Sequence, residues 1–130
     1  MKFFKRFFVF TFLCFFIFSL SPAEENVKTI KLKIIELLEK AKTETSTAYK
    51  KLKGKNHKEA PEYIDNAIEA LEEAIKATNE ISDDQLKSDI ETLKSRLERA
   101  KEKNRLVAAR ELQKVGKKLK ALIKKLKADN

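Results

Sequence analysis

One row of side chains in this sequence could hold a metal ion. Four carboxylates recur at intervals of three and four residues, which places them on one face of a helix, and the single histidine precedes them. Oxygen ligands can gather a hard cation, but no loop here completes the coordination shell. We therefore expect the row to be a solvated face and the histidine an ordinary exposed residue. The candidate ligands for a divalent metal ion are His57, Glu62, Asp65, Glu69 and Glu72.

Residues that carry covalent or acid–base catalysis are scarce. His57 is the only histidine, Cys14 is the only cysteine, and no glycine-rich loop could cradle a phosphate. A strong transition-metal site would need several histidine or cysteine ligands. We expect a protein that is not an enzyme, with no catalytic residues and no cofactor beyond a weakly held divalent ion.

The first 23 residues have the three parts of a secretory signal peptide. Three basic residues precede an apolar stretch over 7–20, and the small residues Ser21 and Ala23 mark a cleavage site. The stretch is too short to cross a hydrocarbon core about 30 Å thick. We predict cleavage after Ala23 and a periplasmic or secreted protein without a transmembrane span. Its mature domain, 24–130, has no cysteine for a disulfide.

A second set of charged side chains is a run of lysines near the C-terminus. Residues 116–127 read GKKLKALIKKLK, with six lysines and no acid. The leucines continue a stripe that starts at Ala108, so we expect them to be buried in the fold rather than inserted in a membrane. The lysines stay outside in either case. They define a candidate anion-binding surface: Lys114, Lys117, Lys118, Lys120, Lys124, Lys125 and Lys127.

The partners that such a surface favours are anionic. An anionic surface or an acidic protein fits this chemistry. Nucleic acid fits less well, because Tyr49 and Tyr63 are the only aromatic side chains after residue 23 that could stack on bases. Export would also separate the protein from intracellular nucleic acid.

Helix is favoured over nearly the whole mature chain, because lysine, glutamate, alanine and leucine dominate it. Apolar residues recur at intervals of three and four in four segments, 27–53, 57–80, 83–103 and 105–128. The predicted stripes are Ile30, Ile34, Leu37, Ala41, Thr45, Ala48 and Leu52; Ala60, Ile64, Ala67, Leu71, Ala74, Thr78 and Ile81; Leu86, Ile90, Leu93, Leu97 and Ala100; and Ala108, Leu112, Val115, Leu119, Leu122 and Leu126.

Local signals set the ends of these segments. Gly54 suits the left-handed residue that ends a helix, and Pro61 belongs in the first turn of the second helix. The residues SDDQ match a capping box, with Ser82 as the cap and Gln85 closing the box. Asn104 marks a soft final break.

Four amphipathic helices with short links predict an all-α fold, namely an antiparallel up-down-up-down four-helix bundle. If the last two segments ran on without a break, the chain would form a three-helix bundle with a long last helix. The first segment has eight basic and three acidic residues, and the fourth has nine and one. The second segment has two basic and seven acidic residues, and the third has six of each. Neighbouring first and last helices would therefore share a basic flank.

Two stretches resemble a known family. The run NAIEALEEAIKA over 66–77, with GKNHKEAPEY before it, is similar to a repeat unit of the small metal-binding protein family, and LERAKEKNRLVAARELQKV over 97–115 has a similar leucine–alanine helix-turn-helix pattern. That resemblance implies a periplasmic four-helix bundle, and in the family many histidines bind copper, nickel and other divalent metals. Where the family places histidine before alanine, this sequence has Asn66 and Glu73. The metal-binding function therefore does not carry over residue by residue.

Two hypotheses about function follow. The first is an exported binding or envelope-stress protein that resembles the small metal-binding proteins and binds through its charged faces. The alternative is a protein that binds polyanions or anionic membranes through its lysine-rich first and fourth helices.

Mass spectrometry of the exported protein tests the signal peptide. The chain should begin at Glu24, because the small residues before it fit signal peptidase. Exported protein that still begins at Met1 would refute cleavage and indicate an N-terminal anchor.

Overall fold

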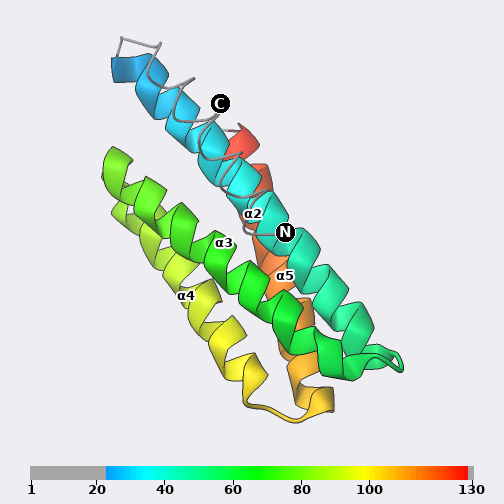
Figure 1. Cartoon of the computed structure of the whole chain (residues 1–130). Coiled ribbons are helices and arrows are strands. Elements are labelled where there is room, and N and C mark those ends of the chain that lie inside the picture. Colours follow the sequence, from blue (N-terminus) through cyan, green and yellow to red (C-terminus); the bar gives the residue numbers. More distant parts are fainter. Residues whose placement is uncertain (1–22, 129–130) are drawn as a thin grey trace.

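The computed structural model describes residues 23–128, and the predicted signal peptide lies outside this range apart from Ala23. Every long element within the range is an α-helix, which confirms the all-α prediction. The break before the last helix is present, so the three-helix alternative does not hold. The elements are α2 (Ala23–Lys53), the 3₁₀ turn η1 (His57–Glu59), α3 (Ala60–Ile81), α4 (Asp84–Lys101) and α5 (Arg105–Ala128) (Figure 1).

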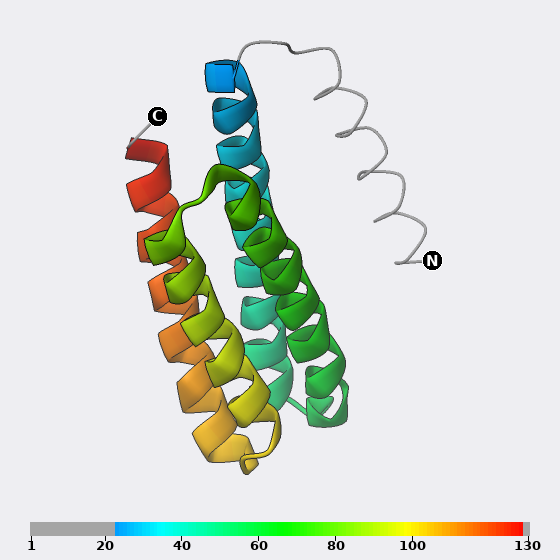
Figure 2. The same ribbon diagram turned by 90° about the vertical axis from the view of Figure 1, so that its left-hand side faces the viewer.

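The four helices lie side by side along their lengths (Figure 1, Figure 2). α2 packs against α3 and α5, and α4 packs against the same two helices. Each helix therefore has its neighbours in sequence beside it, and α5 returns to α2. In this ring the most acidic helix, α3, lies diagonally across from the most basic helix, α5.

The core is built mainly from leucine, isoleucine and alanine and follows the predicted stripes closely. All five predicted positions of α4, from Leu86 to Ala100, are buried. In α2 the stripe passes through Leu38, which has no exposed surface, and Ile35 is buried as well. The buried face of α2 is wider than a single stripe because this helix packs between two others. The predicted core residues that are only half-buried are Leu37, Ile81 and Leu122.

The turn between α3 and α4 departs from the sequence prediction. Ser82 ends α3 in the left-handed conformation, with φ 53°. The cap of α4 is Asp83, whose carboxylate accepts a hydrogen bond from the backbone N of Leu86 at 3.0 Å. The predicted capping box is wrong by one residue, because Ser82 terminates the preceding helix. Gln85 donates to Asp89 at 3.0 Å instead of closing the box.

The end of α2 is closed by a side chain from α5. No described glycine has a positive φ, so the prediction of a left-handed Gly54 is wrong. The Arg105 guanidinium instead donates to the backbone carbonyls of Leu52 and Gly54, the latter at 2.9 Å. A helix end leaves such carbonyls without partners, and a positive charge there also complements the helix dipole. Arg105 thus ties the start of α5 to the end of α2.

Two other predicted boundaries are confirmed. Pro61 lies in the first turn of α3, which begins at Ala60. Asn104 stands directly before α5, and its side-chain oxygen accepts a hydrogen bond from the backbone N of Val107 at 3.0 Å. This contact satisfies one of the free N–H groups at the start of the helix.

Replacing Leu71 with aspartate tests the register of the core. Leu71 is fully buried in the middle of α3. Leu71→Asp should place an unpaired carboxylate in the core and lower the free energy of unfolding by at least about 3 kcal/mol, a large share of the stability of a domain this small. Thermal denaturation followed by circular dichroism measures the loss.

Asn79→Asp is the matched control, because it adds the same charge at an exposed position of α3. It should melt close to wild type. Retained helicity and an unchanged melt in Leu71→Asp would contradict the register.

Candidate anion-binding face

The lysines of α5 are exposed because the opposite face of this helix is buried. Alanine, leucine, isoleucine and valine side chains between Ala108 and Leu126 fill one side of the core. Burial of that stripe turns the polar side of α5 towards solvent. All seven lysines of the predicted anion-binding surface, here called the lysine face, are exposed: Lys114, Lys117, Lys118, Lys120, Lys124, Lys125 and Lys127.

Most of the lysine face has no internal counter-charge. Among the described residues, Lys127 is the one member that pairs with a carboxylate, that of Glu39 on α2 at 3.3 Å. α5 has a single acid, Glu111, and its carboxylate lies 3.9 Å from Arg96 of α4. The other six lysines therefore keep their charge available for an external anion.

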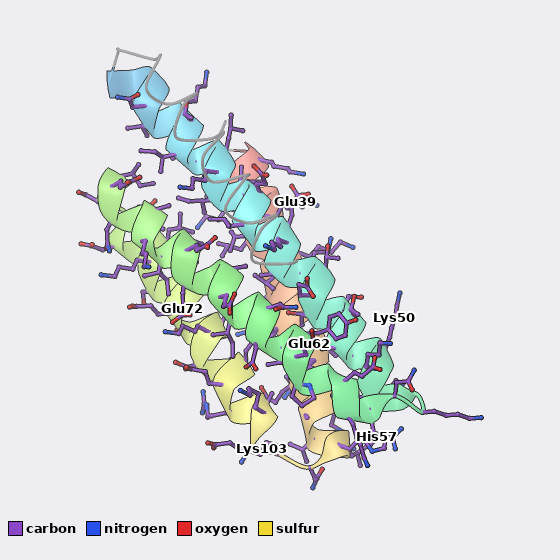
Figure 3. All side chains as sticks on the ribbon, in the orientation of Figure 1. Glu39, Lys50, His57, Glu62, Glu72 and Lys103 are labelled. Carbon is purple, nitrogen blue, oxygen red and sulfur yellow. The ribbon has the colours of Figure 1, made fainter. Side chains whose placement is uncertain are left out.

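α2 adds positive charge beside the lysine face. The two helices are in contact, so the two most basic segments of the chain lie next to each other. Lys50 lies near the end of α2 (Figure 3), and the Lys53 ammonium stacks over the Tyr49 ring at 5.1 Å. Charges of one sign on a shared flank raise the local concentration of anions. The exposed lysines of α2 include Lys28, Lys40, Lys42, Lys50 and Lys53.

Part of the acidic row of α3 faces lysines of α4. Asp65 pairs with Lys101 at 2.6 Å, and Glu72 pairs with Lys94 at 3.3 Å. These four side chains are partly exposed, so each pair contributes little to stability on its own. Their effect on the charge distribution is larger. Asp65 and Glu72 neutralise lysines of α4, so these two carboxylates are not available to pair with the lysines of α5.

The remaining candidate metal ligands are His57, Glu62 and Glu69. Both glutamates have interactions with other groups, and Glu62 lies along α3, away from the η1 corner that holds His57 (Figure 3). His57 is half-buried rather than exposed as predicted, and its Nδ1 is buried without a hydrogen-bond partner in the described structure. Within residues 23–128, no three histidine, cysteine, aspartate or glutamate side chains group closely enough to hold a metal ion.

The corner between α2 and α3 holds an ion pair that shifts the pKa of Lys51. Lys51 at the end of α2 pairs with Glu59 of η1 at 2.9 Å, and its ammonium lies 5.9 Å from the Tyr63 ring centre. The hydrogen bond to Glu59, together with the charge of that carboxylate, raises the pKa of Lys51 above its ordinary value. The pair links the last turn of α2 to the start of the next element.

A shallow groove of about 330 Å³ lies between α4 and α5 and is not apparent from the sequence. It depends on how two helices pack, which no local pattern specifies. Its only trace in the sequence is that Lys118 and Lys125 are seven residues apart and so share one edge of α5. The lining residues are Asp89, Thr92, Leu93, Lys118, Ala121, Leu122 and Lys125.

Comparisons with known proteins do not assign the chain to a family. No protein-family model, curated protein or solved structure matches the chain. None of the helices in the described range is long and apolar enough to span a membrane. The function therefore has to be inferred from the arrangement of charges.

The Lys51–Glu59 pair predicts a pH-dependent contribution to stability. Because the pKa of Lys51 is raised in the folded chain, the pair stabilises the fold fully below the ordinary lysine pKa of about 10.4. This contribution is lost as the pH rises through the raised value. Glu59→Gln should therefore lower the urea midpoint slightly at pH 8, and the difference from wild type should shrink as the pH rises through the raised pKa of Lys51.

Equilibrium urea unfolding at pH 8 and at a series of higher pH values measures this difference. Glu80→Gln removes an exposed acid of the neighbouring α3 that has no described ion pair, so it should not reproduce the effect. An equal loss at pH 8 in both variants would show that net charge, and not the pair, is responsible.

Proposed function

We propose that this protein is an exported, non-enzymatic binding protein that holds extended polyanions through its lysine face. The observation that carries the proposal is the missing counter-charge, because six exposed lysines of α5 have no carboxylate partner in the described structure. On α4, by contrast, Lys94 and Lys101 are paired. A row of unpaired cations steers polyanions towards it and releases their bound counterions.

The proposal includes an antiparallel up-down-up-down bundle. Asp65 pairs with Lys101 and Glu72 with Lys94, so residue numbers rise along α3 as they fall along α4. α5 is likewise antiparallel to α2 in this arrangement. The start of α5 contacts the end of α2, and the end of α5 contacts the middle of α2. This topology supports a basic flank made of α2 and α5.

Export is part of the same proposal. Cleavage after Ala23 would release the domain into the periplasm or the medium, where polymers and lipopolysaccharide carry negative charge. The lysine face would meet such partners there without competition from intracellular nucleic acid.

Electrostatic attachment is favoured over insertion into a membrane. The exposed large apolar side chains of the described residues are Val27, Leu32, Leu106 and Val107. None of them lies among the lysines between 114 and 127, where the leucines are buried or half-buried. An interfacial helix needs a free apolar face to enter the headgroup region. Metal binding has less support, because Asp65 and Glu72 are paired with lysines.

Titration with inorganic polyphosphate tests the proposed function. Removing four charges from the lysine face should weaken binding at about 0.1 M salt by tenfold or more and make its dependence on salt shallower, because fewer counterions are released. Isothermal titration calorimetry at several salt concentrations measures both quantities. The test variant carries Lys114→Gln, Lys117→Gln, Lys120→Gln and Lys124→Gln.

A control variant removes four lysines that lie outside α2 and α5, namely in η1, in α3, in α4 and in the loop after α4. Its net charge is the same, so binding within about twofold of wild type would show that position matters and not total charge. Equal losses in the two variants would refute the lysine face as the binding site. The control carries Lys58→Gln, Lys76→Gln, Lys87→Gln and Lys103→Gln.

A further inference from the structure

The groove between α4 and α5 has an apolar floor. Leu93 of α4 is 3% exposed, Leu122 of α5 is half-buried against the core, and Ala121 is exposed beside it. The small Ala121 side chain leaves the space that the groove occupies. A volume of about 330 Å³ is at the lower end of the range for small-molecule sites.

The rim of the groove carries excess positive charge. Lys118 and Lys125 stand on one edge of α5, about 10 Å apart along the helix axis. Both are exposed, and neither has an ion pair in the described structure. The lining contains one carboxylate, Asp89, which already accepts a hydrogen bond from Gln85 at 3.0 Å. The Thr92 hydroxyl is also occupied, because it donates to the Ser88 carbonyl at 3.0 Å.

We infer that this groove binds a single-chain anionic amphiphile, such as a fatty-acid anion. The apolar chain lies along Leu93, Ala121 and Leu122, and the headgroup lies between the two lysines of the rim. Charge complementarity selects an anionic headgroup, and the small volume selects one chain. The inference rests on the proposed function because Lys118 and Lys125 belong to the lysine face, but it adds an apolar requirement that a polyanion does not have.

Calorimetric titration of the purified protein with dodecanoate, below the concentration at which micelles form, tests the inference. Wild-type protein should bind dodecanoate saturably at one site. Dodecyl maltoside, which has the same chain and a neutral headgroup, should bind at least about tenfold more weakly, since the charged headgroup contacts are lost.

Two pairs of lysine variants separate the rim from the rest of the lysine face. Lys118→Gln with Lys125→Gln should weaken dodecanoate binding at least about tenfold. Lys117→Gln with Lys124→Gln removes the same charge from the same helix at the same spacing, but neither residue lines the groove. This second pair should leave dodecanoate binding within about twofold of wild type, whereas both pairs should weaken polyphosphate binding to a similar extent.

A filling variant tests the floor independently of charge. Ala121→Phe should occupy the groove and abolish dodecanoate binding while polyphosphate still binds. Gln113→Phe is the control, because it adds the same ring at an exposed position of α5 outside the groove. Circular dichroism establishes that both variants are folded.

The outcomes distinguish this inference from the proposed function. Absence of saturable dodecanoate binding, or equal losses in the two lysine pairs, would overturn the groove site even if polyphosphate binding is normal. Dodecanoate binding that survives Ala121→Phe would overturn it as well. If wild-type protein binds dodecanoate as described but does not bind polyphosphate, the proposed function is overturned and the groove site still stands.

Discussion

The apolar face of α5 is buried against the other helices and so is not available to insert into a membrane. The rest of the structure depends on this burial. Its leucines, alanines and isoleucine pack into the core, where α5 closes the ring by contacting both α2 and α4. A chain this short has little core to spare, and the described residues contain no cysteine to support it with a disulfide. The side of α5 that carries the lysines therefore remains exposed to solvent.

The order of the helices in the ring decides which lysines stay unpaired. α3 carries the excess of acidic residues and packs against α4, where Asp65 and Glu72 meet Lys101 and Lys94. α5 lies diagonally across from α3, beyond the reach of those carboxylates, and its own single acid contacts α4. Had the acidic and the most basic helix been neighbours, their charges would have cancelled, and little positive potential would remain.

The buried faces of the helices could be predicted from the sequence, but most contacts between the helices could not. All five stripe positions from Leu86 to Ala100 are buried, because three- and four-residue spacing is a local property of the chain. Gly54 was predicted to be left-handed, yet Arg105 closes that helix end from 51 residues away, and no local signal reports such a contact. Ser82 is left-handed because it terminates α3, and the next residue, Asp83, caps α4. The exposure of the lysines follows from the stripe, but their lack of counter-charge and the groove beside them follow only from helix order.

The seam between α2 and α5 joins two helices of like charge, which costs stability. Contacts across this seam include one near each end: Arg105 donates to the Leu52 and Gly54 carbonyls, and Lys127 pairs with Glu39. The net positive charge of both helices opposes this packing, and an external anion would reduce that repulsion. A polyanion that binds only the folded chain would relieve this repulsion and stabilise the fold by mass action. In the proposed function, binding strength and seam stability would therefore be coupled, because the same net positive charge attracts the polyanion and opposes the packing of α2 against α5.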